Sequence, residues 1–297
     1  MILSGHLKGF LFILMADIMW GLSATAAKYL FNRQVSPFDL VQVRLILSFV
    51  LLTAYLLIFN RSLLRINRSD IPYMIILGIF GVAIVQFTYY FTISQTNVAT
   101  AVFLEYLAPV FILLYGLLAG KEKASAVKLL ALVGAILGGF LMVKGTTGSG
   151  MAVTVPGLIS GLASAISFAF YTVYGKYGLE KYSPWTLLTW GMGVGGAVWA
   201  LYNPPWITFS SYGTYGDWLF FVYIAVFATI LPFGFFFKGL KYLSPVVAGI
   251  TSTMEPVLAG ILSFILLGEV LTFMQITGCA LILSAVIMLQ VKAEKQA

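Results

Sequence analysis

Two acidic residues lie inside apolar stretches of the chain, and each has a proline close by. Glu255 stands directly before Pro256, and Glu105 lies four residues before Pro109. A carboxylate near the centre of a bilayer costs roughly 2.5–3.5 kcal/mol on insertion scales. A helical proline also frees the carbonyl four residues before it, and lipid cannot satisfy that group. The two stretches therefore predict broken helices that share one polar, protein-lined site.

A third acidic residue, Asp17, lies in the first apolar stretch. Helical spacing aligns it with Gly21, Ala24 and Lys28, and the small residues permit close approach of a neighbouring helix or a ligand. Asp17 is either a cavity acid that binds a substrate amine or a proton, or a structural group held in an ion pair or by a hydroxyl. Intramembrane ionisable residues are functional by default, so we include Asp17 in the candidate site.

The prolines have two interpretations. Pro109, Pro256 and Pro232, which lies in a further apolar stretch, are either hinges about which half of a helix rocks or static kinks. In the second case, Glu105 and Glu255 bond to backbone groups that the kinks free. Burial disfavours the charged form of a carboxyl group, which makes both glutamates candidate proton carriers.

Aromatic and amide side chains supply the rest of the candidate site. Rings that line a cavity favour apolar or aromatic substrates, while tyrosine hydroxyls and amides orient them. Packing in the core or against lipid is the commoner role for any single ring. The substrate-binding candidates, chosen as a group by helix face and by repeat position, are Trp20, Gln86, Tyr89 and Phe168.

A further charged residue, Arg44, lies about six residues inside the second apolar stretch, about 9 Å deep at 1.5 Å per residue. A long arginine side chain can reach the headgroups from that depth. We expect this in preference to capture of a substrate carboxylate, for which Lys28 is the other candidate.

Composition indicates what must position these residues. The chain has 297 residues, of which 61% are hydrophobic and 9% charged, whereas soluble domains carry about 25% charged residues. The formal net charge is +7, but the basic residues lie in short loops between apolar runs and do not predict a nucleic-acid partner. One cysteine, Cys279, and one histidine, His6, exclude an internal disulfide and a metal cluster built from those residues.

The apolar runs predict an all-α membrane protein with ten transmembrane helices, because about 20 helical residues cross the hydrocarbon core. Most Lys and Arg residues fall in one set of alternate loops and tails. Since cytoplasmic loops carry the excess of Lys and Arg, we expect both termini to be cytoplasmic. The expected location is the plasma membrane, as a multi-pass protein, which in a bacterium is the inner membrane. The expected spans are about 9–31, 38–59, 71–93, 97–119, 126–144, 155–177, 185–202, 217–238, 245–267 and 272–291.

The second half of the chain repeats the first at an offset of 147 or 148 residues. Lys28 matches Lys176, and Ala108-Pro109 matches Glu255-Pro256. Five spans per half mean that the second half is inverted relative to the first, a pattern typical of secondary transporters. We therefore predict two five-helix units, 1–148 and 149–297, that enclose a central cavity as one transport domain.

These features resemble the drug/metabolite transporter superfamily, EamA type. The resemblance rests on Trp20-Gly21, Glu255-Pro256, Leu267-Gly268-Glu269 and Gly278, and it covers almost the whole chain. It implies a ten-helix inverted-repeat fold around a central cavity and export of small metabolites, amino acids among them. Within the superfamily, the chain is most similar in general likeness to bacterial aromatic amino-acid exporters. The first half has Ala108 where the second has Glu255, so the two acids are not treated as equivalent.

The leading interpretation is a secondary transporter that exports aromatic and other neutral amino acids, or similar small metabolites, by alternating access. The alternatives are an exporter of cationic drugs or other metabolites, and a passive facilitator or channel. An enzyme is disfavoured, because the sequence has no HExxH motif, no protease motif and no match to the phosphate loop GxxxxGK[ST]. We predict no catalytic residue, no metal site and no cofactor. The expected partners are a small-molecule substrate and membrane lipid, with protons as a candidate co-substrate, for a monomer or a homodimer.

Overall fold

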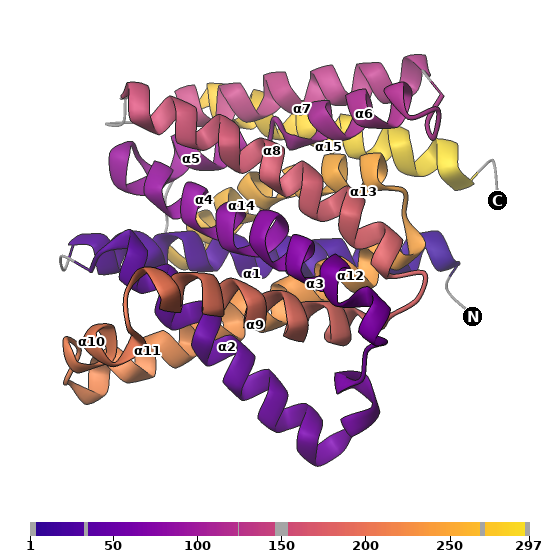
Figure 1. Ribbon diagram of the computed structural model, residues 1–297. Helices are drawn as coiled ribbons and strands as arrows, with labels where there is room; N and C mark the ends of the chain where they lie inside the picture. The colour runs from indigo at the N-terminus through magenta and orange to yellow at the C-terminus, as the bar shows by residue number, and fades with distance from the viewer. Residues whose placement is uncertain (1–3, 33–34, 124, 146–153, 268–270, 295–297) are drawn as a thin grey trace.

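The computed structural model describes residues 4–32, 35–123, 125–145, 154–267 and 271–294, and their side chains except those of 23–32, 262–267 and 291–294. All regular structure within these ranges is helical (Figure 1). The first half contains α1 (Gly5–Asn32), α2 (Pro37–Phe59), η1 (Arg61–Leu64), η2 (Arg68–Asp70), α3 (Ile71–Ile76), η3 (Leu77–Ala83), α4 (Ile84–Gln95), α5 (Val98–Glu105), α6 (Ala108–Leu118) and α7 (Ala126–Lys144). The second half contains α8 (Val155–Gly178), α9 (Pro184–Tyr202), α10 (Pro205–Ser210), α11 (Tyr215–Ala225), η4 (Val226–Ile230), α12 (Leu231–Tyr242), α13 (Pro245–Thr251), η5 (Ser252–Met254), α14 (Glu255–Leu267) and α15 (Phe273–Glu294).

These elements follow the ten predicted spans. In the part of the chain that the structure describes, eight helical stretches are long and apolar enough to cross a membrane, and 245–261 forms a shorter apolar one. The remaining span is α9, which is 19 residues long. Its hydropathy is lowered by several glycines and tryptophans, and its glycines allow close packing on α2: a Cβ at Gly193 would lie 2.8 Å from the ring of Phe49. The predicted boundary between the two units, at 148/149, lies outside the described residues.

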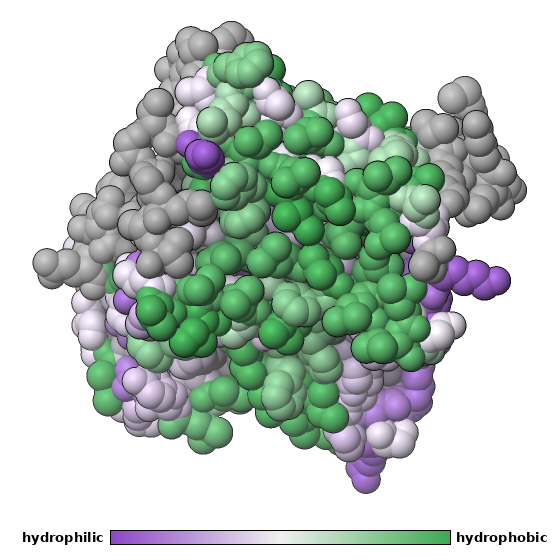
Figure 2. All heavy atoms as spheres, turned by 90° about the horizontal axis from the view of Figure 1, so that it is seen from above, coloured by the Kyte–Doolittle hydropathy of each residue, from purple (hydrophilic) through white to green (hydrophobic). Residues whose placement is uncertain are grey.

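The surface suits a lipid environment. Seen from above, the molecule presents a broad hydrophobic face over α6, α7 and α8, and hydrophilic side chains gather mainly toward one side of the view (Figure 2). Leu130 and Leu137 of α7 and Ile159 and Ile166 of α8 are among the exposed large apolar side chains. A face of this size marks contact with an apolar medium, which is consistent with a membrane-spanning protein.

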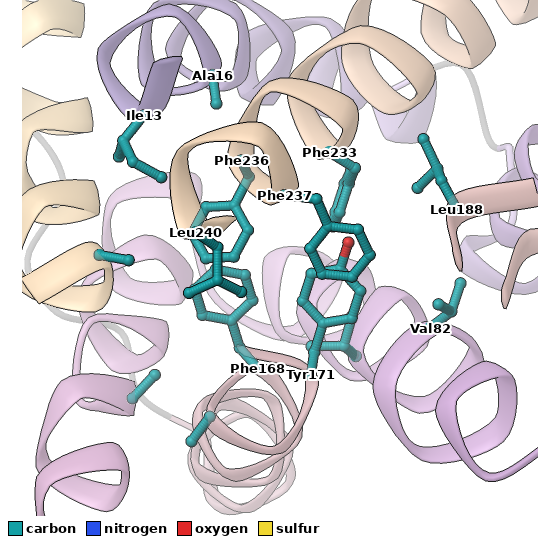
Figure 3. Close-up of a cluster of buried hydrophobic side chains, with 14 of the residues drawn as sticks. Ile13, Ala16, Val82, Phe168, Tyr171, Leu188, Phe233, Phe236, Phe237 and Leu240 are labelled. Carbon is teal, nitrogen blue, oxygen red and sulfur yellow. The ribbon is translucent and has the colours of Figure 1, made fainter. Parts of the chain in front are cut away.

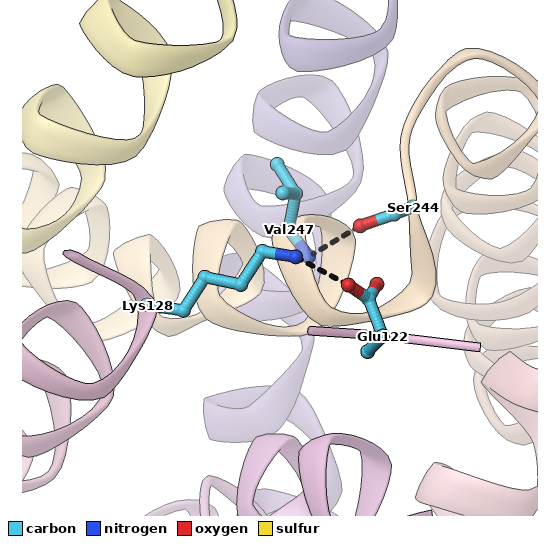
Figure 4. A network of polar contacts seen from close by, with 4 residues as sticks. All are labelled: Glu122, Lys128, Ser244 and Val247. Carbon is cyan, nitrogen blue, oxygen red and sulfur yellow. Dashed lines mark hydrogen bonds and ion pairs between the residues drawn. The ribbon is translucent and has the colours of Figure 1, made fainter. Parts of the chain in front are cut away.

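Serine–proline pairs begin three of the helices. Ser36, Ser183 and Ser244 each occupy the position before the helix, and each side chain accepts a hydrogen bond from a backbone N–H of the first turn. Figure 4 shows this bond for Ser244 and Val247, near the ion pair of Lys128 and Glu122. A serine cap followed by proline is a strong start signal for a helix, so this motif sets where α2, α9 and α13 begin.

The helix pairs with the most extensive contacts join the two halves. The pairs are α1 with α12, α8 with α4, α2 with α9, and α7 with α15. Exchanging the halves turns the first pair into the second and leaves the other two unchanged. The main contacts are thus symmetric under exchange of the two halves, and neither half is a separately packed body.

Four spans depart from regular α-helix. The third and eighth spans contain π-helical turns, η3 and η4, at corresponding positions, and such turns occur frequently at functional sites. The fourth span breaks at residues 106–107 between α5 and α6, and the ninth breaks at η5 between α13 and α14. Pro109, Pro232 and Pro256 each lie in the first turn of the helix that follows an irregularity. Proline has no backbone N–H, and in the first turn of a helix that group would have no intrahelical partner, so these positions accommodate proline without loss of a hydrogen bond.

An aromatic core holds the first, sixth and eighth spans together. Phe233, Phe236 and Phe237 of α12 face Phe168 and Tyr171 of α8, with Ile13 and Ala16 of α1 on the other side (Figure 3). The rings of Tyr171 and Phe237 stack with centroids 4.6 Å apart, and those of Phe168 and Phe236 lie 5.3 Å apart. This core supports the wall of the cavity described next.

Candidate functional site

A cavity lies where the breaks of the fourth and ninth spans meet. It is lined by charged, polar and aromatic side chains, the mixture that small-molecule sites use to orient a ligand. Its wall comes from α1, α2, α4, α5, α6, α8, α12, α13, η5 and α14, so both halves contribute. Of the residues predicted to bind substrate, those that line it are Trp20, Gln86, Tyr89, Glu105, Phe168 and Glu255.

The two glutamates reach the cavity from the edges of the helix breaks. Glu105 is the last residue of α5, and its Oε2 accepts a hydrogen bond of 2.7 Å from Ser164 Oγ on α8. Glu255 is the first residue of α14. Ala108 and Ser252 also line the wall, next to the same breaks. The arrangement places two acidic groups beside backbone that is not continuous helix.

Asp17 lies behind the cavity wall. Its side chain is fully buried, it does not line the cavity, and neither carboxylate oxygen has a hydrogen-bond partner among the described residues. It is near enough to Glu255 for the two charges to interact. Helix α1 approaches α14 closely at Gly21, where a Cβ would lie 3.5 Å from the carbonyl oxygen of Glu255 and 3.3 Å from Ala259 Cβ. Direct contact of Asp17 with a substrate is therefore not available in this conformation.

Aromatic rings form one side of the cavity. Trp20 contacts the ring of Phe233 edge-on at 5.0 Å and that of Phe168 at 6.2 Å. On α4, Tyr89 lines the cavity beside Gln86, and its ring lies 5.2 Å from that of Tyr90. Such a wall provides apolar surface and ring faces for an aromatic or cationic group.

The sequence-based expectation for Arg44 is wrong. Arg44 does not extend to the headgroups; its side chain is 1% exposed and lines the cavity. Its Nη2 donates to the carbonyl of Ala228 at 2.8 Å and its Nε to Thr229 Oγ1 at 3.0 Å, both in the π-helical turn η4. Acceptors that lie far away in the sequence turn the side chain inward, and an analysis of the second span alone has no access to them.

Comparison with known proteins identifies the architecture. A model of the EamA-like transporter family matches residues 7–144 and, a second time, residues 155–291. The chain is 30% identical to the uncharacterized inner membrane transporter YicL of Salmonella typhimurium, over 98% of this chain and 97% of that protein. The chain belongs to the EamA-like transporter family.

Further relatives and a solved structure agree with this assignment. The EamA-like chain is 33% identical to an uncharacterized transporter of Archaeoglobus fulgidus over 70% of its own length and 74% of that protein. It is 25% identical to the riboflavin transporter ImpX of Fusobacterium nucleatum over 96% of its length and 98% of ImpX. A solved structure with 21% identity superposes with a TM-score of 0.77 and covers 99% of this chain and 98% of its own; at that identity it supports the fold alone. The protein is thus a multi-pass membrane transporter, and the narrower resemblance to aromatic amino-acid exporters stays a prediction.

Several lining residues of this EamA-like transporter were not among the predicted site residues. They include Arg44, Tyr106, Phe233, Gly249 and Ser252. The repeat offset provides a signal for Ser252, because it corresponds to Glu105, and intramembrane charge provides one for Arg44. Phe233 and Tyr106 carry no such mark among the many aromatic residues of the chain.

Other predicted residues lie away from the cavity. Of the three hinge candidates, Pro109 lines the cavity, whereas Pro232 and Pro256 do not. The side chain of Lys28, the alternative candidate for a substrate carboxylate, and Glu269 lie outside the described residues. Lys176 donates to the carbonyls of Leu240 and Leu243 at 2.7 and 2.9 Å, and this bonding stabilises the end of α12.

Proposed function

We propose that this EamA-like transporter exports aromatic and other neutral amino acids, and that the central cavity is their binding site. The observation that carries the proposal is the joint presence of Glu105, Glu255 and an aromatic wall in one cavity between the repeats. Carboxylates bind a substrate ammonium through charge-assisted hydrogen bonds, and Trp20, Phe168 and Phe233 offer ring surface to an aromatic side chain.

Alternating access is the proposed mechanism. Helices that are already interrupted near the cavity have two halves that can move relative to each other with little loss of backbone hydrogen bonding. The moving units are the third with the fourth span and the eighth with the ninth, which turn about the irregular segments next to Pro109, Pro232 and Pro256. Inverted repeats with broken helices at the binding site are typical of this mechanism.

Protons are the proposed co-substrate. Glu105 and Glu255 line the cavity, and Asp17 lies close to Glu255 behind it, so a proton and a substrate ammonium compete for the same carboxyl groups. Under this proposal, transport by Glu255→Gln and Glu105→Gln loses its dependence on a pH gradient. If both variants transport normally at every pH tested, neither residue carries the proton.

We place the protein in the bacterial inner membrane with both termini cytoplasmic and the two units 1–148 and 149–297 inverted. The charge distribution of the loops supports this orientation. Labelling of single cysteines introduced near residues 6 and 213, in a Cys279→Ser background, tests it. The N-terminal site reacts only after the membrane is permeabilised, and the site near 213 reacts from outside intact cells.

A second candidate substrate class is a planar heteroaromatic metabolite. The relative ImpX is named as a riboflavin transporter, and ring faces at Trp20 and Phe233 suit a flat aromatic system. This class differs from amino acids in not requiring an ammonium group for Glu105 and Glu255.

Counterflow in proteoliposomes tests the proposed function. Vesicles loaded with unlabelled phenylalanine, methionine, threonine, riboflavin or a sugar are supplied with the same compound in labelled form. Accumulation with amino acids and not with sugar supports the proposal, and accumulation with riboflavin alone supports the second candidate. Flux without trans-stimulation contradicts alternating access and favours a passive facilitator. A parallel set of vesicles is loaded with a cationic drug, and exchange of the drug alone would replace the amino-acid assignment.

A further inference from the structure

Arg44 is a buried cation in the cavity wall that has no carboxylate partner in the described part of the protein. The ion pairs there join Lys128 with Glu122 and Lys181 with Asp70, and neither involves Arg44. Glu105 and Glu255 line the same cavity but do not pair with it. Arginine remains protonated in proteins, so the cavity wall contains a permanent positive charge.

The groups that hold Arg44 in place are all neutral. The π-helical turn η4 supplies the carbonyl of Ala228 and the hydroxyl of Thr229, which together accept from Nη2 and Nε. The guanidinium carbon lies 4.7 Å from the centre of the Tyr90 ring, which gives a favourable cation–π contact. These contacts fix the orientation of the guanidinium group without neutralising its charge.

Of the three guanidinium nitrogens of Arg44, Nη1 alone does not bond to the carbonyl and hydroxyl groups of η4. Nη1 is buried and has no hydrogen-bond partner among the described residues, although the residue lines the cavity. A buried, unpaired charge with an unsatisfied donor is costly. An anionic group placed in the cavity would satisfy both the charge and the free N–H groups.

We propose that Nη1 of Arg44 binds the carboxylate of the transported substrate. The inference rests on the proposed amino-acid function and deepens it, because it makes an anionic group a requirement for recognition. The cavity then has a cation subsite at Glu105 and Glu255, an anion subsite at Arg44 and a ring surface at Trp20. The substrate class is an α-amino acid bound as a zwitterion, and an aromatic amine without a carboxylate lacks one of these contacts.

Competition for counterflow on the wild-type protein is the first test. Labelled phenylalanine exchange is measured against phenylalanine, phenethylamine, which lacks the carboxylate, and 3-phenylpropionate, which lacks the ammonium group. Loss of a hydrogen bond to a charged group weakens binding by about tenfold or more. We expect phenethylamine to compete at least about tenfold less well than phenylalanine. Equal competition by the two compounds overturns the proposal and leaves the amino-acid function intact.

The second test uses Arg44→Lys, which keeps the positive charge but shortens its reach, with the same change at the exposed Arg61 as a matched control. We expect Arg44→Lys to weaken the apparent affinity for phenylalanine about tenfold and to change that for phenethylamine by no more than about twofold. Arg61→Lys should change neither affinity. Equal weakening of both ligands indicates a structural role and overturns the proposal. If Arg44→Lys does not fold, the wild-type competition decides the question alone.

Two further arms separate failure of this inference from failure of the amino-acid function. In one outcome, labelled 3-phenylpropionate exchanges, Arg44→Lys abolishes that exchange, and phenylalanine does not exchange. That outcome supports the anion subsite and contradicts the amino-acid assignment. Replacing chloride by gluconate tests for an inorganic anion at the same nitrogen. If amine exchange requires chloride and Arg44→Lys abolishes that requirement, the site holds an inorganic ion and the substrate-carboxylate proposal is overturned.

Discussion

The broken helices of the fourth and ninth spans place the same two positions on the cavity wall but fill them in opposite order. At the repeat offset of 147, Glu105 corresponds to Ser252 and Ala108 corresponds to Glu255, and all four residues line the cavity. The first repeat therefore has its acid before the break, and the second has it after the break. The pseudo-symmetric scaffold determines which positions face the cavity, while the amino acids at those positions have diverged.

The neighbours of the two acids differ as well. Glu105 accepts a hydrogen bond from Ser164 on α8, the first helix of the second repeat. Glu255 lies near Asp17 on α1, the first helix of the first repeat. A hydroxyl donor stabilises a carboxyl group, whereas two nearby carboxylates repel each other when both are charged. Glu255 interacts electrostatically with both Asp17 and Glu105, whereas Glu105 has the hydroxyl of Ser164 as its hydrogen-bond donor. Glu255 is therefore the acid more sensitive to protonation and to a bound cation.

The largest effect is expected from removing the charge of Glu255. Glu255→Gln should lower kcat/KM for phenylalanine counterflow by about 100-fold, because a hydrogen bond to a charged group is worth about 1.5–3 kcal/mol. Glu105→Gln should lower it by about tenfold, since glutamine still accepts the hydrogen bond of Ser164. Initial rates in proteoliposomes with matched amounts of protein give both values.

The matched control is Glu180→Gln, which makes the same change at an exposed position and should leave the rate within about twofold. Equal losses in the two cavity variants would show that the different surroundings of the acids have no functional consequence. A larger loss at Glu105 would reverse the assignment of roles.

Much of the fold could be predicted from the sequence because its determinants are local. Apolar runs of spanning length, serine–proline helix starts and helix-breaking prolines such as Pro109 and Pro256 each act within a few residues. The π-helical turns η3 and η4 were not predicted. Only η4 ends next to a proline, Pro232, and π-helical turns have no clear sequence signal.

The candidate site was predicted less completely, because cavity lining depends on how each helix is rotated. Trp20 and Phe168 were chosen from their repeat positions, and Glu255 from its charge within an apolar stretch next to Pro256. Asp17 shares the first helix with Trp20 but lies behind the wall. Arg44 faces the cavity because its acceptors, Ala228 and Thr229, lie more than half the chain away. Sequence periodicity identifies a helix face but not the neighbour that the face meets.

The next largest effect is expected where the two broken helices touch. Gly249 of α13 corresponds to Val102 of α5, and both line the cavity. A Cβ at Gly249 would lie 2.9 Å from Ile112 Cδ1 and 3.5 Å from Pro109 Cγ. Gly249→Val should therefore lower the counterflow rate by about tenfold and destabilise the protein by about 1–3 kcal/mol through overpacking. Counterflow and the thermal unfolding midpoint in detergent report the two effects.

A change at the corresponding position of the first repeat, Val102→Ala, is the control for this contact. It removes volume from the cavity wall instead of adding it, so we expect a loss of transport of no more than about threefold. Normal transport by Gly249→Val would show that the two broken helices do not need to approach closely at this point. A larger loss in Val102→Ala would place the more sensitive contact on the first broken helix.

The smallest effects distinguish the two serines that accompany the acids. Ser164→Ala removes the donor to Glu105 and should cost about 1 kcal/mol of stability, together with a loss of transport of about threefold. Ser252 Oγ is buried without a hydrogen-bond partner among the described residues. Ser252→Ala therefore breaks no hydrogen bond within the described protein and should leave the unfolding midpoint unchanged or slightly raised, with transport within about twofold.

The two readouts together test whether Ser252 completes the second acid position. Suppose Ser252→Ala lowers phenylalanine transport as much as Ser164→Ala does, but without a change in the unfolding midpoint. The Ser252 hydroxyl then bonds to the substrate. The second repeat would then supply a polar pair, Ser252 and Glu255, where the first supplies Glu105 and the apolar Ala108. Such a result would sharpen the comparison, because the asymmetry between the breaks would lie in direct substrate contacts as well as in the partners of the two acids.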